Sequence, residues 1–199
     1  MSRPWVESWR DDEFVRRARS EGYRARSAFK LAELDERHRL VRPGSTAVDL
    51  GAAPGAWCQY LRRHGASRVV AIDLLPMEPI PGVGFIQGDF REDAALSALL
   101  EGLGPAGADL VLSDLAPNMG GMKAVDQPRA MHLAELALDL AGRVLVSGGS
   151  FVVKVFHGEG FDPFVREVRE GFDSVRIRKP RASRPRSPEV YVVACGHRV

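Results

Sequence analysis

A lysine inside an apolar strand is the residue of this chain that most directly suggests chemistry. Residues 150–156, Ser-Phe-Val-Val-Lys-Val-Phe, read as a buried strand, and buried lysines are uncommon and usually paired or functional. The chain has 24 arginines but only four lysines, so it uses arginine where charge alone is needed. Since lysine can release its proton and arginine does not, proton transfer explains Lys154 better than charge, with a structural lysine as the alternative.

A glycine-bearing turn is the second such feature. Residues 49–57, Asp-Leu-Gly-Ala-Ala-Pro-Gly-Ala-Trp, join a β-prone run to a helical one, and Gly51 and Gly55 allow a sharp turn close to a ligand. The chain has neither a Gly-x-Gly-x-x-Gly spacing there nor a Gly-x-x-x-x-Gly-Lys phosphate loop. Such a turn, ending in an aromatic residue, favours a nucleoside with an uncharged or cationic appendage, and S-adenosylmethionine fits. The alternative is an ordinary strand-to-helix turn.

Acidic residues stand at the ends of three further strands. Asp73 lies 22 residues beyond Gly51, where an acid accepts hydrogen bonds from ribose hydroxyls in doubly wound nucleoside sites. Asp89 follows a strand at 83–87, and Asp114 ends a strand at 109–114. In an open α/β sheet the ligand occupies the crevice at these carboxyl ends, so we expect a nucleoside site there.

The elements that must carry these residues alternate between strand and helix. The periodicity predicts strands at 45–48, 68–73, 83–87, 109–114, 150–156, 174–178 and 190–194. It predicts helices at 22–39, 58–63, 93–100, 129–146 (closed by Gly148-Gly149) and 161–172. This alternation indicates an α/β fold with helices on both faces of the sheet.

Composition narrows the class of protein. With 199 residues, 45% hydrophobic and 27% charged, the chain is predicted to form one globular domain. It has no apolar run long enough to span a bilayer, and its charged N-terminus is unlike a secretory signal. The two cysteines, Cys58 and Cys195, form no close pair, which argues against a disulfide scaffold or a zinc site. We therefore expect a cytoplasmic protein without a metal or a membrane partner.

Positive charge gathers at the two ends of the chain. Residues 1–42 carry 11 Lys and Arg against 8 Asp and Glu, residues 43–174 carry 10 against 17, and residues 175–186 carry 6 against none. This distribution predicts a surface for a polyanion, with a solvated basic loop as the alternative. The arginines expected to contact RNA are Arg24, Arg26, Arg181, Arg184 and Arg186.

Six motifs in order give the chain a family resemblance. They are Asp-Leu-Gly-Ala-Ala-Pro-Gly-x-Trp, Asp-Leu-Leu-Pro-Met, Gln-Gly-Asp-Phe, Ser-Asp-Leu-Ala-Pro-Asn-Met, Gly-Gly-Ser-Phe-Val-Val-Lys-Val-Phe and Ser-Arg-Pro-Arg-Ser-x-Glu-Val-Tyr. Across residues 23–196 the chain resembles the FtsJ family of RNA ribose 2′-O-methyltransferases, most of all the bacterial members that modify a uridine of large-subunit (23S) ribosomal RNA. One departure is Ala56, where the family usually has a second glycine.

The resemblance implies a Rossmann-like fold that binds S-adenosylmethionine, with a seven-stranded, mostly parallel sheet that includes one antiparallel strand. It also implies a catalytic set of two lysines, an aspartate and a glutamate. These are Lys30, Asp114, Lys154 and Glu189, with Lys154 as the proton acceptor. The implied cofactor contacts are Gly55, Trp57, Asp73, Asp89 and Asp114.

The activity that the resemblance implies is methylation of the ribose 2′-hydroxyl of a uridine in 23S ribosomal RNA. S-adenosylhomocysteine would be the product, no metal would be needed, and a monomer would act during maturation of the large ribosomal subunit. Residues 1–42 would be an RNA-facing extension of a catalytic core at 43–199. The hydroxyl must lose its proton as it attacks, and a lysine with the ordinary pKa of about 10.4 is a poor base at neutral pH. A second cation and burial would favour the neutral amine, whereas a carboxylate opposes it.

Two other classes of protein stay open at this point. Methyltransferases that act on a base amine typically carry Asp/Asn-Pro-Pro-aromatic after the fourth strand, and residues 114–117, Asp-Leu-Ala-Pro, do not match that motif. A noncatalytic RNA-binding assembly factor with a relic cofactor site is the other, and the presence of all four catalytic residues weighs against it.

Overall fold

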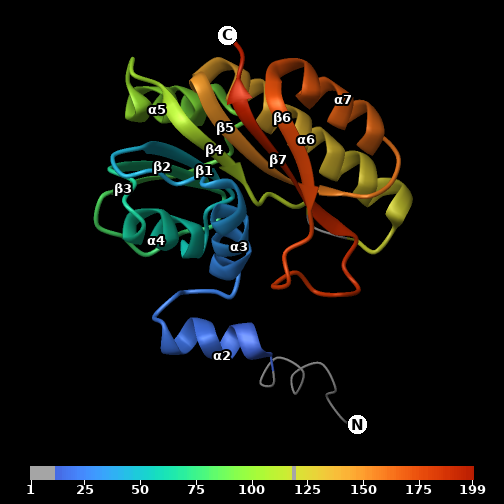
Figure 1. Ribbon diagram of the computed structural model, residues 1–199, viewed down its shortest axis with the longest axis horizontal. Helices are drawn as coiled ribbons and strands as arrows, with labels where there is room; N and C mark the ends of the chain where they lie inside the picture. The colour runs from blue at the N-terminus through green and yellow to red at the C-terminus, as the bar shows by residue number, and fades with distance from the viewer. Residues whose placement is uncertain (1–11, 118–119) are drawn as a thin grey trace.

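The protein is an open sheet with helices on both faces, as a computed structural model shows for residues 12–117 and 120–199 (Figure 1). The strands are β1 (Thr46–Leu50), β2 (Arg68–Asp73), β3 (Val83–Gln87), β4 (Ala108–Ser113), β5 (Leu145–Phe156), β6 (Phe172–Arg178) and β7 (Glu189–His197). Their order is β3-β2-β1-β4-β5-β7-β6. Neighbours among β1 to β5 pair in parallel, whereas β7 is antiparallel to both β5 and β6. This confirms the predicted seven-stranded, mostly parallel sheet with one antiparallel strand.

The strand order creates a crevice between β1 and β4. The chain runs outward from β1 to β2 and β3, and then returns to place β4 on the other side of β1. At such a reversal, the connections after the two central strands leave in opposite directions and open a ligand crevice at their carboxyl ends. The turn after β1 and the residue after β4, Asp114, therefore lie at the same place.

Helices cover both faces of the sheet (Figure 1). On the first face α3 (Ala28–His38) and α4 (Ala56–Arg63) bury Leu31 and Leu61 against β-strand residues such as Leu112. On the second face lie α5 (Asp93–Leu103), α6 (Lys123–Val144) and α7 (Phe161–Gly171). Since both faces are covered, the central strands are apolar on both sides and read as continuous hydrophobic runs.

The predicted helix at 22–39 is wrong in its first part. The structure instead has α2 (Glu13–Ser20), a connection at 21–27, and α3. Asp12 caps α2 by accepting hydrogen bonds from the backbone N–H groups of Phe14 and Val15. Gly22 has a φ of +70°, which a helix cannot accommodate, so the chain turns there and brings α2 against α3.

The boundary between α6 and β5 also differs from the prediction. Helix α6 begins six residues earlier than expected and runs through Pro128, whose nitrogen cannot donate a helical hydrogen bond. The residues Gly148 and Gly149, expected to end the helix, lie inside β5. The β4–β5 pairing shifts register there, from Ala108 opposite Leu145 to Leu110 opposite Ser150, so this stretch forms an irregularity at the start of the strand.

Candidate active site

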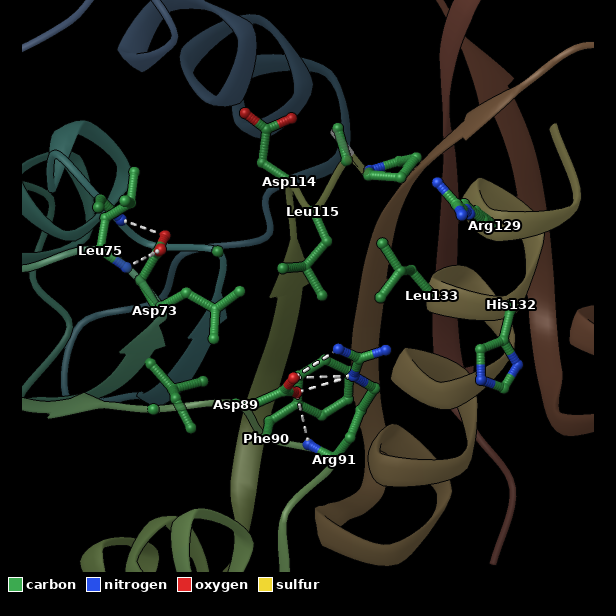
Figure 2. A pocket seen from close by; sticks show the side chains of 17 residues that line it. Asp73, Leu75, Asp89, Phe90, Arg91, Asp114, Leu115, Arg129, His132 and Leu133 are labelled. Carbon is green, nitrogen blue, oxygen red and sulfur yellow. Dashed lines mark hydrogen bonds and ion pairs between the residues drawn. The ribbon is translucent and has the colours of Figure 1, made fainter. Parts of the chain in front are cut away.

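A cleft of about 620 Å³ lies at the carboxyl ends of β1, β2, β3 and β4 (Figure 2). This volume is within the range that small-molecule sites occupy. The cleft combines carboxylates at strand ends with apolar walls from the segments that follow β2, β3 and β4 and from α6. Its lining comprises Gly51, Ala53, Ile72, Asp73, Leu74, Leu75, Gly88, Asp89, Phe90, Arg91, Asp114, Leu115, Ala116, Pro117, Arg129, His132 and Leu133.

Asp73 holds two walls of this cleft together. One carboxylate oxygen accepts a hydrogen bond from the backbone N–H of Ala53 at 2.9 Å, and the other accepts one from Leu75 at 2.8 Å. The first contact reaches the turn after β1 and the second reaches the segment after β2 (Figure 2). Asp73, the residue predicted to bind the ribose, therefore lies in the cleft. The backbone N–H groups of Ala53 and Leu75, which also line the cleft, fix the position of its carboxylate.

Asp89 also lies in the cleft, where it pairs with Arg91. The guanidinium donates to the carboxylate at 2.5, 2.9 and 3.0 Å, and the Arg91 backbone N–H adds a bond of 3.0 Å. The side-chain hydrogen bond from Arg91 is the main cause that holds the pKa of Asp89 below its usual range. Asp89 is therefore an ionised acceptor whose oxygens already have donors, and a ligand amine would share them.

Gly55 and Trp57 support the turn but are not among the residues that line the cleft. Gly55 begins α4 with a φ of +104°, a conformation that side chains disfavour. The Trp57 ring is 3% exposed in the core, and its indole N–H donates to the carbonyl of Ser27 at 2.8 Å. Their assignment as cofactor contacts stays a prediction.

The four predicted catalytic residues lie close together as two ion pairs. Lys154 Nζ is 3.1 Å from the carboxylate of Asp114 and also donates to the Asp114 carbonyl at 2.6 Å. Lys30 Nζ is 2.7 Å from the carboxylate of Glu189. The two lysine side chains are only 9% and 13% exposed, so both pairs are largely withdrawn from water. The four residues come from four places in the fold: helix α3, the residue that follows β4, strand β5 and the first residue of β7.

Tyr191, which the sequence analysis did not identify, connects these two pairs. Its hydroxyl donates to the Asp114 carboxylate at 2.6 Å and accepts from Lys30 Nζ at 3.2 Å. The chain of contacts thus runs from Glu189 through Lys30, Tyr191 and Asp114 to Lys154. A signal was present, because Tyr191 stands two residues after Glu189 in a strand and so lies on the same face.

Tyr191 is a hydrogen-bonding residue rather than a base. The ring is fully buried and stands opposite Lys154 in the pairing of β5 with β7. Burial, followed by the negative charges of Asp114 and Glu189, raises the pKa of Tyr191 well above its ordinary value of 10. The hydroxyl therefore keeps its proton at neutral pH and orients its neighbours.

The five arginines predicted to contact RNA divide into two groups. Arg24 and Arg26 are used inside the protein: Arg24 donates to three backbone carbonyls, and Arg26 contacts Asp12 and the carbonyl of Ala182. Burial and then the nearby cation of Arg184 lower the pKa of Arg26. The other three, Arg181, Arg184 and Arg186, are exposed on the loop between β6 and β7.

Within residues 12–117 and 120–199, no group of three or more His, Cys, Asp or Glu side chains is placed to hold a metal ion. None of the described helices is long and apolar enough to cross a bilayer. Cys58 and Cys195 are both free thiols.

The strand order, with a carboxylate-lined cleft at the reversal beside β1, defines the class of Rossmann-like folds that bind nucleosides. Comparison with known proteins agrees. The profile of the FtsJ-like methyltransferase family matches residues 23–197, and the chain belongs to this family.

Three similar proteins support this membership. The chain is 56% identical over 197 residues to the ribosomal RNA large subunit methyltransferase E of Alkalilimnicola ehrlichii, covering 98% of this chain and 94% of that protein. It is 57% identical over 194 residues to the protein of the same name from an Azoarcus species, covering 96% and 95%. A crystal structure of a Plasmodium falciparum protein assigned as a ribosomal RNA methyltransferase superposes with a TM-score of 0.73 at 28% identity, covering 88% and 98%.

Proposed function

We propose that this chain transfers a methyl group from S-adenosylmethionine to the ribose 2′-hydroxyl of a uridine in 23S ribosomal RNA. The observation that carries the proposal is the buried set of contacts that joins Lys154, Asp114, Tyr191, Lys30 and Glu189 beside the cleft. The substrate class comes from two relatives, each named as a methyltransferase of the large-subunit ribosomal RNA.

The cleft fits such a cofactor chemically. Asp73 at the end of β2 would accept hydrogen bonds from ribose hydroxyls, and Asp89 after β3 would lie near the adenine amine. Apolar side chains such as Phe90 and Leu133 offer walls for a purine, and the carboxylates suit a ligand with cationic groups. When bound, S-adenosylmethionine supplies an electrophilic methyl group, and S-adenosylhomocysteine is the product.

Lys154 is proposed to accept the proton of the ribose hydroxyl. A neutral amine has two N–H groups and one lone pair. Its two contacts to Asp114, one to the carbonyl and one to the carboxylate, would use both N–H groups. The lone pair would then be left to accept a proton, and Asp114 would stabilise the ammonium that forms. Lys30 and Glu189 would hold the hydroxyl and balance the charge.

The exposed loop before β7 is proposed to bind the RNA backbone through Arg181, Arg184 and Arg186. Residues 1–42 would form an RNA-facing extension of the catalytic core at 43–199. The substrate would be ribosomal RNA in the large subunit, modified in the cytoplasm by a monomer during subunit maturation, without a metal. Phosphate contacts of this kind position RNA but carry no sequence information, so the choice of uridine would depend on other contacts.

Two measurements test the proposal. Transfer of a labelled methyl group from S-adenosylmethionine to large-subunit RNA, mapped to a ribose oxygen, is expected; label on a base would instead favour an amine methyltransferase. Lys154→Arg keeps the charge but cannot accept the proton, so single-turnover rates should fall roughly 10²–10⁴-fold while cofactor affinity is retained. A variant rate within about threefold of the parent, at saturating cofactor and RNA, would refute proton acceptance by Lys154.

A further inference from the structure

We propose that Arg24 is a positioning residue for the cofactor-binding turn and not a contact of RNA. The inference rests on the proposed function, because it assigns a role in binding the nucleoside cofactor. It concerns the connection between α2 and α3, which contacts the turn after β1 through Arg24.

Arg24 gathers three backbone carbonyls from two separate segments. Nη1 donates to the carbonyl of Pro54 at 3.0 Å and to that of Glu78 at 2.7 Å, while Nη2 donates to that of Pro79 at 3.0 Å. Pro54 belongs to the turn after β1, and the other two belong to the segment after β2. The backbone N–H of Arg24 is itself held by the Gln59 side chain on α4, at 2.8 Å.

The two segments that Arg24 joins are walls of the cleft. Ala53 of the turn and Leu74 and Leu75 of the segment after β2 line it directly. Asp73 bridges them on the cleft side, by accepting from the backbone of Ala53 and Leu75. Arg24 bridges them from outside the cleft, since it is not among the lining residues, so one side chain inside the cleft and one outside it join the two walls.

The side chains of these segments pack closely against the turn at Gly55. A Cβ atom added there would lie 2.7 Å from Ile80 Cδ1, 2.8 Å from Met77 Sδ and 3.0 Å from Arg24 Nη1. The segment after β2 is therefore seated on the turn, with the guanidinium beside the contact. Loss of the guanidinium would release three carbonyls to water and allow the walls to separate.

Arginine suits this position better than lysine does. Its planar fork presents several N–H groups in fixed directions, whereas a lysine ammonium is a single compact donor on a flexible stem. Three carbonyls on two segments need the fork. A phosphate, by contrast, can be bound by either residue, so the Arg24→Lys variant separates the two roles.

The experiment compares the parent with Arg24→Ala, Arg24→Lys and the control Arg63→Ala. Arg63 is a matched choice, because its guanidinium donates to two backbone carbonyls of this connection, those of Glu21 and Gly22, and none of its hydrogen bonds to the described residues reaches the turn. Affinity for S-adenosylhomocysteine is measured by calorimetry. KM for the cofactor and kcat are measured with saturating RNA, and RNA affinity at several salt concentrations. Thermal unfolding checks that each variant is folded.

Arg24→Ala should weaken S-adenosylhomocysteine binding roughly ten- to a hundredfold, the contribution of about one hydrogen bond from a charged group, because water can replace part of the three lost contacts. KM for the cofactor should rise in step, with kcat at saturation and the salt dependence of RNA binding unchanged. Arg24→Lys should fall between the parent and Arg24→Ala, and Arg63→Ala should match the parent. If Arg24→Ala does not fold, Arg24→Lys decides by the same criteria.

Three results would overturn the inference. The first is equal cofactor affinity in Arg24→Ala and the parent, and the second is an equal loss in Arg63→Ala, which would show that the whole connection matters. The third is a loss of RNA affinity with a shallower salt dependence, which would make Arg24 a phosphate contact. Failure of the parent itself to bind S-adenosylhomocysteine would instead refute the proposed function, and is thereby distinguishable.

Discussion

Tyr191→Phe is the most direct test of the proposed catalytic set, because it removes one oxygen atom and leaves the ring in place. The hydroxyl donates to Asp114 at 2.6 Å and accepts from Lys30 at 3.2 Å. Neither charged residue would be left unpaired, since Asp114 keeps Lys154 and Lys30 keeps Glu189. The variant thus uncouples the two ion pairs without breaking either of them.

The expected magnitude follows from these contacts. A hydrogen bond to a charged group contributes about 1.5–3 kcal/mol, and a lost hydroxyl leaves only a small void. If the hydroxyl orients Asp114 and Lys30 in the transition state as in the free protein, the same energy is lost from catalysis, which corresponds to roughly 10- to 100-fold in kcat. For a chain of this size the melting temperature should fall by about 2–4 °C for each kcal/mol.

Single-turnover methylation at saturating cofactor and RNA, together with urea and thermal unfolding, measures both effects. Tyr60→Phe is the matched control, because that buried hydroxyl donates to the Asp35 carboxylate at 2.9 Å, on the face of the sheet that α3 and α4 cover. It should lose similar stability and retain full activity. The pH–rate profile of Tyr191→Phe should keep its shape, since the raised pKa of Tyr191 prevents it from acting as the base.

One outcome would refute this reasoning. If Tyr191→Phe loses as much stability as Tyr60→Phe but keeps kcat within about twofold of the parent, the hydroxyl contributes to folding only. The two ion pairs would then act independently.

Three further predictions concern the cofactor, the RNA and the fold. Asp73→Ala should weaken cofactor binding by roughly ten- to a hundredfold in calorimetry, because the ribose acceptor and the bond to the turn are both lost; unchanged affinity would remove Asp73 from the site. Replacing Arg181, Arg184 and Arg186 with alanine should lower the salt dependence of RNA binding by a slope of about 0.7–0.9 per lost phosphate contact, and an unaltered slope would show a solvated loop. Burial raises the pKa of Asp49 from 3.8 to about 7. The folded state then holds this proton longer than the unfolded state, so stability should fall between pH 4 and 7 and stay lower above pH 7. Urea unfolding of Asp49→Asn should lack this loss, which is on the order of 4 kcal/mol for three pH units; parallel pH profiles for the two proteins would contradict it.

The sheet could be predicted from local pattern because its central strands are covered on both faces. An apolar run that ends in an aspartate, such as Asp73 or Asp114, predicts both a strand and a site residue at its end. The observed β2 has the predicted bounds, 68–73. Lys154 could be identified for the same reason, since a cation inside such a run is conspicuous. Lys30 and Glu189 came only from the family resemblance, because each is an ordinary charged residue in an ordinary amphipathic segment.

The partners of the arginines could not be predicted, because they lie far away in the sequence. Arg24 and Arg26 lie in a segment whose positive charge suggests an RNA-binding surface. Their guanidinium groups, however, contact carbonyls 30 to 156 residues away. A count of charges gives the number of cations in a segment. It does not show how many of them form hydrogen bonds within the folded protein. The beginning of α6 was missed for a local reason, since Pro128 resembles a helix start and here lies inside one.

The direction of β7 explains why the proposed catalytic residues and the basic loop lie at the same edge of the sheet. Because β7 is antiparallel to β5, its first residue lies beside the last residue of β5, with Glu189 opposite Phe156 and Tyr191 opposite Lys154. A parallel strand in this position would present its last residues at the cleft, and would place the loop that precedes it at the other edge. The antiparallel strand instead brings Glu189, Tyr191 and the preceding basic loop to the edge where the cleft lies, at the ends of β1 and β4. Arg181 reaches Glu33 of α3 through its backbone N–H at 2.7 Å, which fixes the loop beside the helix that carries Lys30.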